Sequence, residues 1–303
     1  MFIYLLRRVV FALVLVFTVS SASLLLTRAA PGDYATSDGL RGGRERMKVM
    51  RERYGLDRPV LEQYLRWLGG AIRLDFGYSL AYDRPVTDLI PERAANTALL
   101  AMTALLVATV VGLPLGVVAG SRRGGLLAGS VRLASVVLLS LPPLLTSLFL
   151  VFVAARTGWL PIGGIGTASH LVIPAAALGL PIAALFERLQ AQAMQEVIGQ
   201  PYVLAALARG VPRSRILWRD GLKAALRPVA SVYGLVVATL LSGSFAVETV
   251  TSWPGLGRLM LEALQARDVF LVAGCAATGS LFLACGTLLS DVALAVVDPR
   301  ARE

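Results

Sequence analysis

The sequence predicts an all-α membrane protein with six transmembrane helices, a cytoplasmic loop that carries a short helix, and a small external cap between helices 1 and 2. The first observation is composition: 56% of the 303 residues are hydrophobic, 16% are charged, and the mean hydropathy is +0.70. Soluble domains contain roughly 45–50% apolar and about 25% charged residues, so this balance excludes an ordinary soluble enzyme and a disordered chain. The second observation is six long runs without a charged residue.

These runs have the length of membrane spans, since a helix needs about 20 apolar residues to cross a bilayer. A charge at the centre of a span costs about 2.5–3.5 kcal/mol, so charged residues mark the ends. Glycines and a proline between Gly158 and Gly166 predict a turn, and the fourth helix is therefore expected to begin near His170. The first run is expected to stay uncleaved, because it exceeds a signal-peptide core and lacks a clear cleavage site. The runs lie between Arg8 and Arg28, Arg93 and Arg122, Arg132 and Arg156, Arg156 and Glu187, Arg227 and Glu248, and Asp268 and Asp291.

Basic residues are distributed unequally between the loops on the two sides of the predicted bundle. The short loops and termini on one side carry fourteen Lys and Arg residues against five acidic residues, whereas the long segment from Arg28 to Glu92 is nearly balanced. An excess of Lys and Arg in short loops marks the cytoplasmic face, so both termini are expected to be cytoplasmic. The net charge of +10 is therefore mostly a topology signal and does not indicate nucleic-acid binding.

Residues 29–95 form the predicted external cap. The charged stretch from Arg44 to Tyr54 is expected to form a short helix that stops at Gly55. From Pro59 onward, apolar residues recur at helical spacing, and proline suits the first turn of a helix. We expect this cap to lie on the membrane rim and to contact a partner, with a plain connector as the alternative.

Residues 187–228 form the predicted cytoplasmic loop. Pro201 suits the first position of a short helix, and Gly210 suits its end, because glycine readily adopts the left-handed conformation. A short helix of small residues suits docking into a groove of another protein, and a solvated basic loop is the alternative. One predicted face of this helix contains Tyr202, Val203, Ala206 and Leu207, while Ala205 and Ala208 add little bulk.

The loop motif Ala205-Ala206-x-x-x-Gly210, followed by a basic run, resembles that of binding-protein-dependent ABC importer permeases. Other segments resemble the dipeptide, oligopeptide and nickel branch of that family and follow its order over nearly the whole chain. The sequence departs from the family at Pro201, where an acidic residue is usual, and at Leu204 and Leu207, where basic residues are common. The matching segments are Tyr4–Arg8, Pro31–Asp33, Gly55–Pro59, Asp75–Ser79, Glu248–Arg258 and Asp298–Arg300.

The resemblance implies a permease subunit that moves small peptides, or a related small solute, into the cytoplasm across a bacterial plasma (inner) membrane. The implied partners are two ABC ATPase subunits that bind ATP and Mg, a second homologous permease and an extracytoplasmic solute-binding protein. Trp253, Pro254 and Gly255 are expected to contact the binding protein or to close an outer gate. The expected ATPase-docking residues are Tyr202, Val203, Ala205, Ala206, Leu207, Arg209 and Gly210.

The sequence carries no recognisable catalytic constellation. A Walker A phosphate loop needs Gly-Lys-Ser/Thr, but the only lysines, Lys48 and Lys223, follow Met47 and Leu222, so no cofactor is expected in this chain. His170 is the only histidine, which excludes a cluster of histidine ligands for a metal. Two alternatives stay open: an intramembrane enzyme, with only His170 and Asp291 as candidates, and a structural membrane subunit without transport activity.

Overall fold

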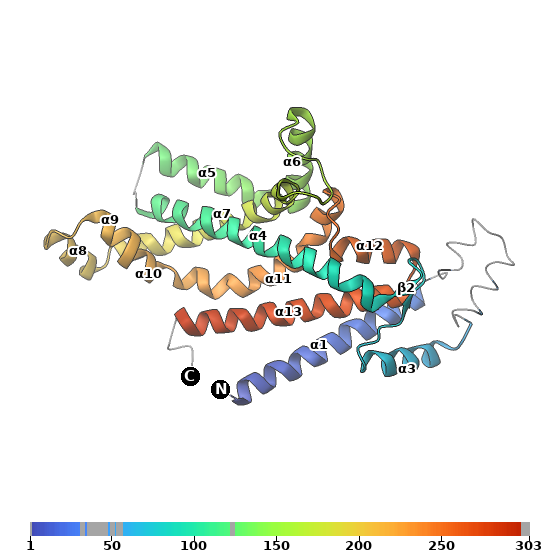
Figure 1. Ribbon diagram of the computed structural model, residues 1–303. Helices are drawn as coiled ribbons and strands as arrows, with labels where there is room; N and C mark the ends of the chain where they lie inside the picture. The colour runs from blue at the N-terminus through green and yellow to red at the C-terminus, as the bar shows by residue number, and fades with distance from the viewer. Residues whose placement is uncertain are drawn as a thin grey trace. The chain divides into compact units, whose positions relative to one another are not determined.

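The computed structural model describes residues 2–30, 57–121 and 125–297, together with Tyr34, Lys48 and Glu52. The described chain is mostly helical and divides into two compact units. Unit 1 comprises residues 1–97 and 254–284, and unit 2 comprises residues 98–253 and 285–303. Helices α4 (Val86–Ser121) and α13 (Val269–Val297) contribute residues to both units (Figure 1). The single permease domain over residues 1–303 stays a prediction.

Unit 1 contains the helix predicted from Pro59, which is α3. The hydroxyl groups of Ser21 and Tyr64 are 3.0 Å apart, and Trp67 packs with Leu24 in an apolar cluster, so α3 lies against α1. The helix expected at residues 44–54 lies largely outside the described residues. The other elements of this unit are α1 (Phe2–Ala29), α3 (Val60–Ala71), β1 (Tyr78–Ser79), antiparallel β2 (Arg84–Pro85) and α12 (Leu256–Ala266).

Unit 2 holds the long helix α7 and the elements packed around it. A short 3₁₀ turn leads into α7, so the fourth span begins where the turn at residues 158–166 predicts. The fifth run begins a helix at Arg227, also as predicted. The elements are α5 (Leu126–Ser140), α6 (Pro143–Thr157), η1 (Ala168–Leu171), α7 (Val172–Ile198), α8 (Pro201–Ala208), α9 (Arg213–Arg215), the π-helix η2 (Ile216–Gly221), α10 (Leu222–Ala225) and α11 (Arg227–Val250).

Four described helices are long and apolar enough to cross a membrane, and they cover Leu6–Ala29, Val86–Ser121, Ala168–Ile198 and Val269–Leu288. Two helix pairs pass the same test only when each is taken together: α5 with α6, and Arg213–Ala225 with Arg227–Leu241. The all-α membrane architecture is confirmed. The described residues give four to six spans, and six applies only if each bent pair is one span.

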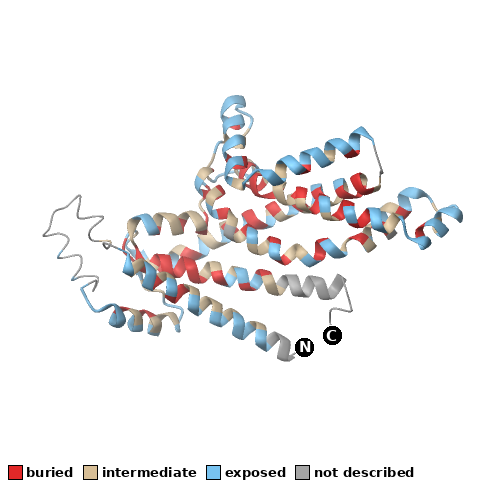
Figure 2. Cartoon of the chain, turned by 180° about the vertical axis from the view of Figure 1, so that it is seen from behind, coloured by how far each residue is buried: buried red, intermediate tan, exposed pale blue. Residues whose placement is uncertain are grey.

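The third charge-free run is not one continuous helix in this structure. α5 ends at Ser140, α6 begins at Pro143, and the helix axis turns by 107° between them. Pro142 and Pro143 explain the break, because proline lacks an amide hydrogen and disfavours helical geometry in the residue before it. Leu141 is accordingly extended, with φ −95° and ψ 119°. Most of α6 is exposed in unit 2 (Figure 2).

Helices α4 and α7 pack backbone against backbone through glycines spaced four residues apart. A Cβ atom on Gly112 would lie 2.5 Å from the Ala183 carbonyl oxygen. A Cβ atom on Gly120 would lie 2.4 Å from the Ala191 carbonyl oxygen, and Gly116 is similarly crowded. Gly-x-x-x-Gly spacing permits this close approach of membrane helices. The contact fixes where α7, and the loop that follows it, stands in unit 2.

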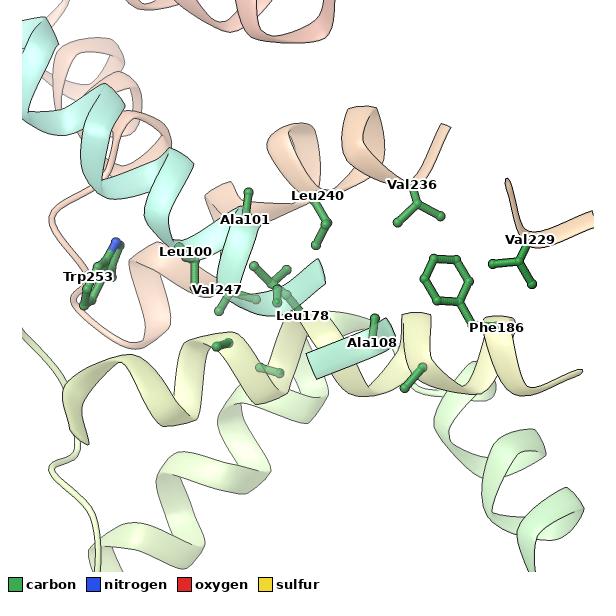
Figure 3. Close-up of a cluster of buried hydrophobic side chains, with 14 residues drawn as sticks. Leu100, Ala101, Ala108, Leu178, Phe186, Val229, Val236, Leu240, Val247 and Trp253 are labelled. Atoms are coloured by element: carbon green, nitrogen blue, oxygen red, sulfur yellow. The ribbon is translucent and has the colours of Figure 1, made fainter. Parts of the chain in front are cut away.

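A cluster of buried apolar side chains extends this contact to α11 (Figure 3). The Phe186 and Tyr233 rings stack with centroids 5.2 Å apart, and the Tyr233 hydroxyl hydrogen-bonds to the Thr109 hydroxyl. The same cluster includes Val247 and Trp253 at the far end of α11. Side chains from α4, α7 and α11 therefore share one core in unit 2.

Candidate functional site

The short helix predicted after Pro201 is present as α8. Its end is a Schellman motif: the Gly210 N–H donates to the Leu207 carbonyl (2.9 Å), and the Val211 N–H donates to the Ala206 carbonyl (3.1 Å). Gly210 has φ +80°, a conformation that glycine adopts without a steric penalty. Pro201 and Gly210 therefore set the two ends of the helix, as their positions in the sequence predict.

The exposed face of α8 differs from the predicted one. Val203 is only 2% exposed and packs inside its own unit, and Ala206 is partly covered. The side chain of Val203 is therefore not accessible to a second protein in this structure, and its docking role stays a prediction. Leu204 is 58% exposed, although the sequence analysis named it only as a departure from the family motif and not as part of the predicted face. The exposed residues of α8 include Tyr202, Leu204, Ala205, Leu207 and Ala208, and Arg209 follows them.

The segment before α8 is not a loop, because α7 continues without interruption to Ile198. Glu187, the expected end of the span, is 1% exposed, and Gln190 is fully buried beside Gly116. Neither the Glu187 carboxylate nor the Gln190 amide has a hydrogen-bond partner among the described residues. A count of charges places the span boundary at Glu187, but the tight contact with α4 buries this carboxylate. The loop boundaries at residues 187 and 228 stay predictions.

Trp253 is 3% exposed and belongs to the unit 2 core (Figure 3). An indole in this position does not present a surface to a second protein, so direct contact with a binding protein has no support in this geometry. The neighbouring turn is close-packed as well: a Cβ atom on Gly163 would lie 2.3 Å from the Thr251 carbonyl oxygen. An outer-gate role for Trp253 stays a proposal.

Pro254 and Gly255 form a joint in unit 1 between the start of α12 and α4. The Asn96 side-chain amide donates to the Pro254 carbonyl (2.9 Å), and the Leu256 N–H donates to the Thr97 hydroxyl (2.8 Å). Gly255 is the residue before the first turn of α12 and is buried. These contacts hold the backbone on both sides of Gly255, and nothing in them identifies a ligand.

Of the two enzyme candidates, His170 is the one whose side chain the structure describes. His170 completes a capping box at η1: its Nδ1 accepts a hydrogen bond from the Thr167 N–H at 3.2 Å. Within the described ranges, no group of three or more His, Cys, Asp or Glu residues could hold a metal ion. The side chain of Asp291 lies outside the described part of the chain.

The sequence analysis missed Asp268, a fully buried carboxylate in unit 1. Its Oδ2 accepts hydrogen bonds from the Ser79 hydroxyl (2.7 Å) and from the backbone N–H groups of Leu80 (2.7 Å) and Ala81 (3.0 Å). Its Oδ1 accepts a bond from the Leu271 N–H (3.1 Å) in the first turn of α13. One side chain thus caps α13 and fixes the turn after β1. An acidic residue directly before a long apolar run is the signal that could have revealed it.

Residues 112–303 match the family described as "Binding-protein-dependent transport system inner membrane component". Residues 1–101 match the N-terminal family described as "Binding-prot-dependent transport system membrane comp, N-term". The two matches together include most residues of both units.

Full-length relatives are similar along almost their whole length. The oligopeptide transport system permease protein AppB of Bacillus subtilis is 31% identical, over 98% of each chain. A putative peptide permease protein of Brucella suis is 32% identical, over 92% of this chain and 91% of the relative. The glutathione transport system permease protein GsiC of Escherichia coli is 30% identical, over 99% of this chain and 98% of the relative.

These matches agree with the apolar helices of the described chain and favour a transport subunit over an intramembrane enzyme or a purely structural subunit. Multi-pass inner-membrane permeases of ABC importers carry no active site of their own. The chain belongs to the family of binding-protein-dependent transport system inner membrane components.

Proposed function

We propose that this chain is one of two homologous permease subunits of an importer that carries small peptides into the cytoplasm. Two ATPase subunits, which bind ATP and Mg, drive the transport, and an external solute-binding protein delivers the cargo. The names of the relatives, which include oligopeptide, peptide and glutathione permeases, support a peptide substrate. The departures at Pro201, Leu204 and Leu207 concern the contacts made at α8.

The observation that carries this proposal is α8, a short helix with exposed apolar side chains. Tyr202 is 52% exposed, Leu204 is 58% exposed, and Leu207 is 40% exposed. In unit 2, α8 and α9 project past the ends of α4 and α5 (Figure 1). A projecting apolar helix suits a groove in another protein. Docking at α8 would couple ATP binding to a shift between two packings of the membrane helices.

The loop that contains α8 is proposed to be cytoplasmic, with both chain termini on the same side. The excess of Lys and Arg around it supports this orientation. The test uses single cysteines in a chain that lacks Cys275 and Cys285. Ser214→Cys should react with an impermeant thiol reagent only after the cells are opened, and Thr87→Cys should react in intact cells. Labelling of Ser214→Cys from outside would reverse the orientation.

The docking role of α8 is tested with Ala205→Glu and Ala208→Glu, both at exposed positions. Each change adds bulk and a charge that would be desolvated in a groove, with a penalty of several kcal/mol if fully buried. We expect normal membrane levels, but loss of ATPase copurification and of labelled-peptide uptake. Ala168→Glu, an exposed alanine at η1, is the matched control and should leave both unchanged. Wild-type uptake in both α8 variants would contradict the proposal.

A further inference from the structure

A cavity of about 410 Å³ lies between the end of α4 and the segment that follows Gly210, the glycine at the end of α8. Apolar side chains form part of its wall, and two hydroxyl groups and one guanidinium group complete it. The exposed indole of Trp218, which projects from the π-helix η2, forms its rim; π-helical turns are frequent at functional sites. The lining residues are Val117, Val118, Ser121, Arg213, Ser214, Leu217 and Trp218.

The guanidinium of Arg213 is held in position at this cavity. It donates a hydrogen bond of 3.0 Å to the backbone carbonyl of Ser121, the last residue of α4. The carbonyl end of a helix attracts a cation, so this contact is favourable and orients the side chain. A guanidinium has five N–H donors in a planar fork that matches a carboxylate. Arg213 therefore presents an oriented cationic group to an occupant of the cavity.

The surrounding surface is strongly basic. Residues 201–225 contain five basic residues and one acidic residue. Exposed apolar side chains of Tyr202, Leu204 and Trp218 lie within the same segment. Association is favoured when the potentials of two faces are opposite, so a matching partner presents acidic groups around an apolar centre. The exposed basic residues are Arg209, Arg213, Arg215, Arg219 and Lys223.

A protein fits this surface better than a lipid layer does. Arg122 and Arg123 follow α4 directly in the sequence and mark the end of its apolar span. In unit 2, α8 projects past the ends of α4 and α5 (Figure 1), so its exposed apolar side chains lie beyond the apolar span of α4, which ends at Ser121. Burial of these side chains then requires another protein.

We infer that α8 and this cavity form one docking surface for an ATPase subunit with an acidic face, and that a carboxylate of that subunit sits against Arg213. The inference rests on the proposed function and adds the chemistry of the partner. It differs from docking at α8 alone, because it assigns a second contact beyond Gly210.

The test measures the affinity of the purified ATPase subunits for the full-length permease in nanodiscs. Arg213→Gln removes the charge and keeps an N–H donor for the Ser121 carbonyl, so the fold should survive. We expect the affinity to fall by about thirtyfold or more, the loss typical of a desolvated charge pair that loses one partner. Trp218→Ala should also weaken binding. Arg188→Gln is the matched control, since Arg188 is exposed and lines a different cavity, and it should bind within about twofold of wild type.

Two comparisons separate the possible failures. If Arg213→Gln binds like wild type while Ala205→Glu loses the ATPase, the cavity contact is overturned and the proposed function stands. If Ala205→Glu also keeps ATPase binding and uptake, docking at α8 fails, and the observation that carries the proposed function is lost. The measurements are repeated with phosphatidylcholine alone and with added phosphatidylglycerol. A defect of Arg213→Gln that occurs only with the anionic lipid would assign the cavity to lipid headgroups and overturn the inference.

Discussion

Asp268 illustrates how one residue organises the start of a membrane helix. Its carboxylate accepts four hydrogen bonds, three of them from the turn after β1. Since the site is fully buried, water does not replace a lost acceptor. The carboxylate thus joins two segments that are almost two hundred positions apart in the sequence.

Asp268→Ala should lower the free energy of unfolding by about 3 kcal/mol or more, because it orphans several buried donors and removes a helix cap. Thermal unfolding of the purified protein in detergent measures the change. Asp88→Ala, an exposed acidic residue in the first turn of α4, is the control and should cost less than about 1 kcal/mol. Equal losses in the two variants would contradict the role of burial.

Tyr82 provides a pH-dependent contact in unit 1. Its hydroxyl donates to Glu262 Oε2 at 2.6 Å, and Arg258 also pairs with Glu262. Burial raises the pKa of Tyr82 to about 12, and the hydrogen bond and the negative charge of Glu262 add to the effect. The neutral phenol is therefore the form that the folded protein favours.

A folded-state pKa above the ordinary value of about 10 contributes stability below pH 10 and loses it as the pH rises toward 12. Tyr82→Phe removes the titrating hydroxyl. The stability difference between wild type and Tyr82→Phe should therefore shrink from pH 10 to pH 12. Thermal unfolding at several pH values tests this, and a constant difference would show that the Glu262 contact does not titrate with Tyr82.

At the scale of elements, the contact between α4 and α7 depends on the absence of side chains. A Cβ atom on Gly116 would lie 2.6 Å from Gln190 Cβ and 2.7 Å from the Glu187 carbonyl oxygen. Gly243 in α11 has nothing within 4 Å of the same position. The two glycines thus allow a comparison in which the chemistry of the change is the same and the surroundings differ.

Gly116→Ala should destabilise the protein by about 1–3 kcal/mol, because overpacking outweighs the higher helix propensity of alanine. Gly243→Ala should be neutral or stabilising by up to about 1 kcal/mol, since only the propensity changes. Unfolding temperatures in one detergent give both values. A shift of both variants in the same direction would show that the α4–α7 contact yields easily to an added methyl group.

Elements defined by local signals were predictable from the sequence. Pro201 and Gly210 bracket α8, and Pro59 precedes α3. Proline fixes φ, and glycine readily adopts a positive φ, whatever surrounds them. Elements whose ends depend on neighbours were not. To predict that α7 continues past Glu187, one must know that glycines of α4 face it there. To predict that Trp253 is buried, one must know how the core of unit 2 is assembled. The sharp turn at Leu141 is only partly predictable from the sequence. Two consecutive prolines predict a break in the helix, but they do not predict an angle of 107°.

At the scale of the whole molecule, the chain has the helices of a transport subunit and lacks a phosphate-binding motif in its sequence. The purified chain should therefore release no phosphate from ATP, and turnover should appear only when the ATPase subunits are added. A phosphate-release assay before and after this addition makes the measurement. Turnover in a preparation shown to be free of ATPase subunits would contradict the expectation.

The glycine contact also determines how stiff unit 2 is. Side chains absorb small displacements by changing rotamers, but two backbones in direct contact have no such compliance. A displacement of α8 would therefore move α7, and α4 would move together with α7 as one rigid pair. The side-chain contacts of α7 with α5, α6 and α11 would then have to rearrange to accommodate this movement. Rearrangement of helices within the unit is therefore expected at these side-chain contacts and not at the α4–α7 contact.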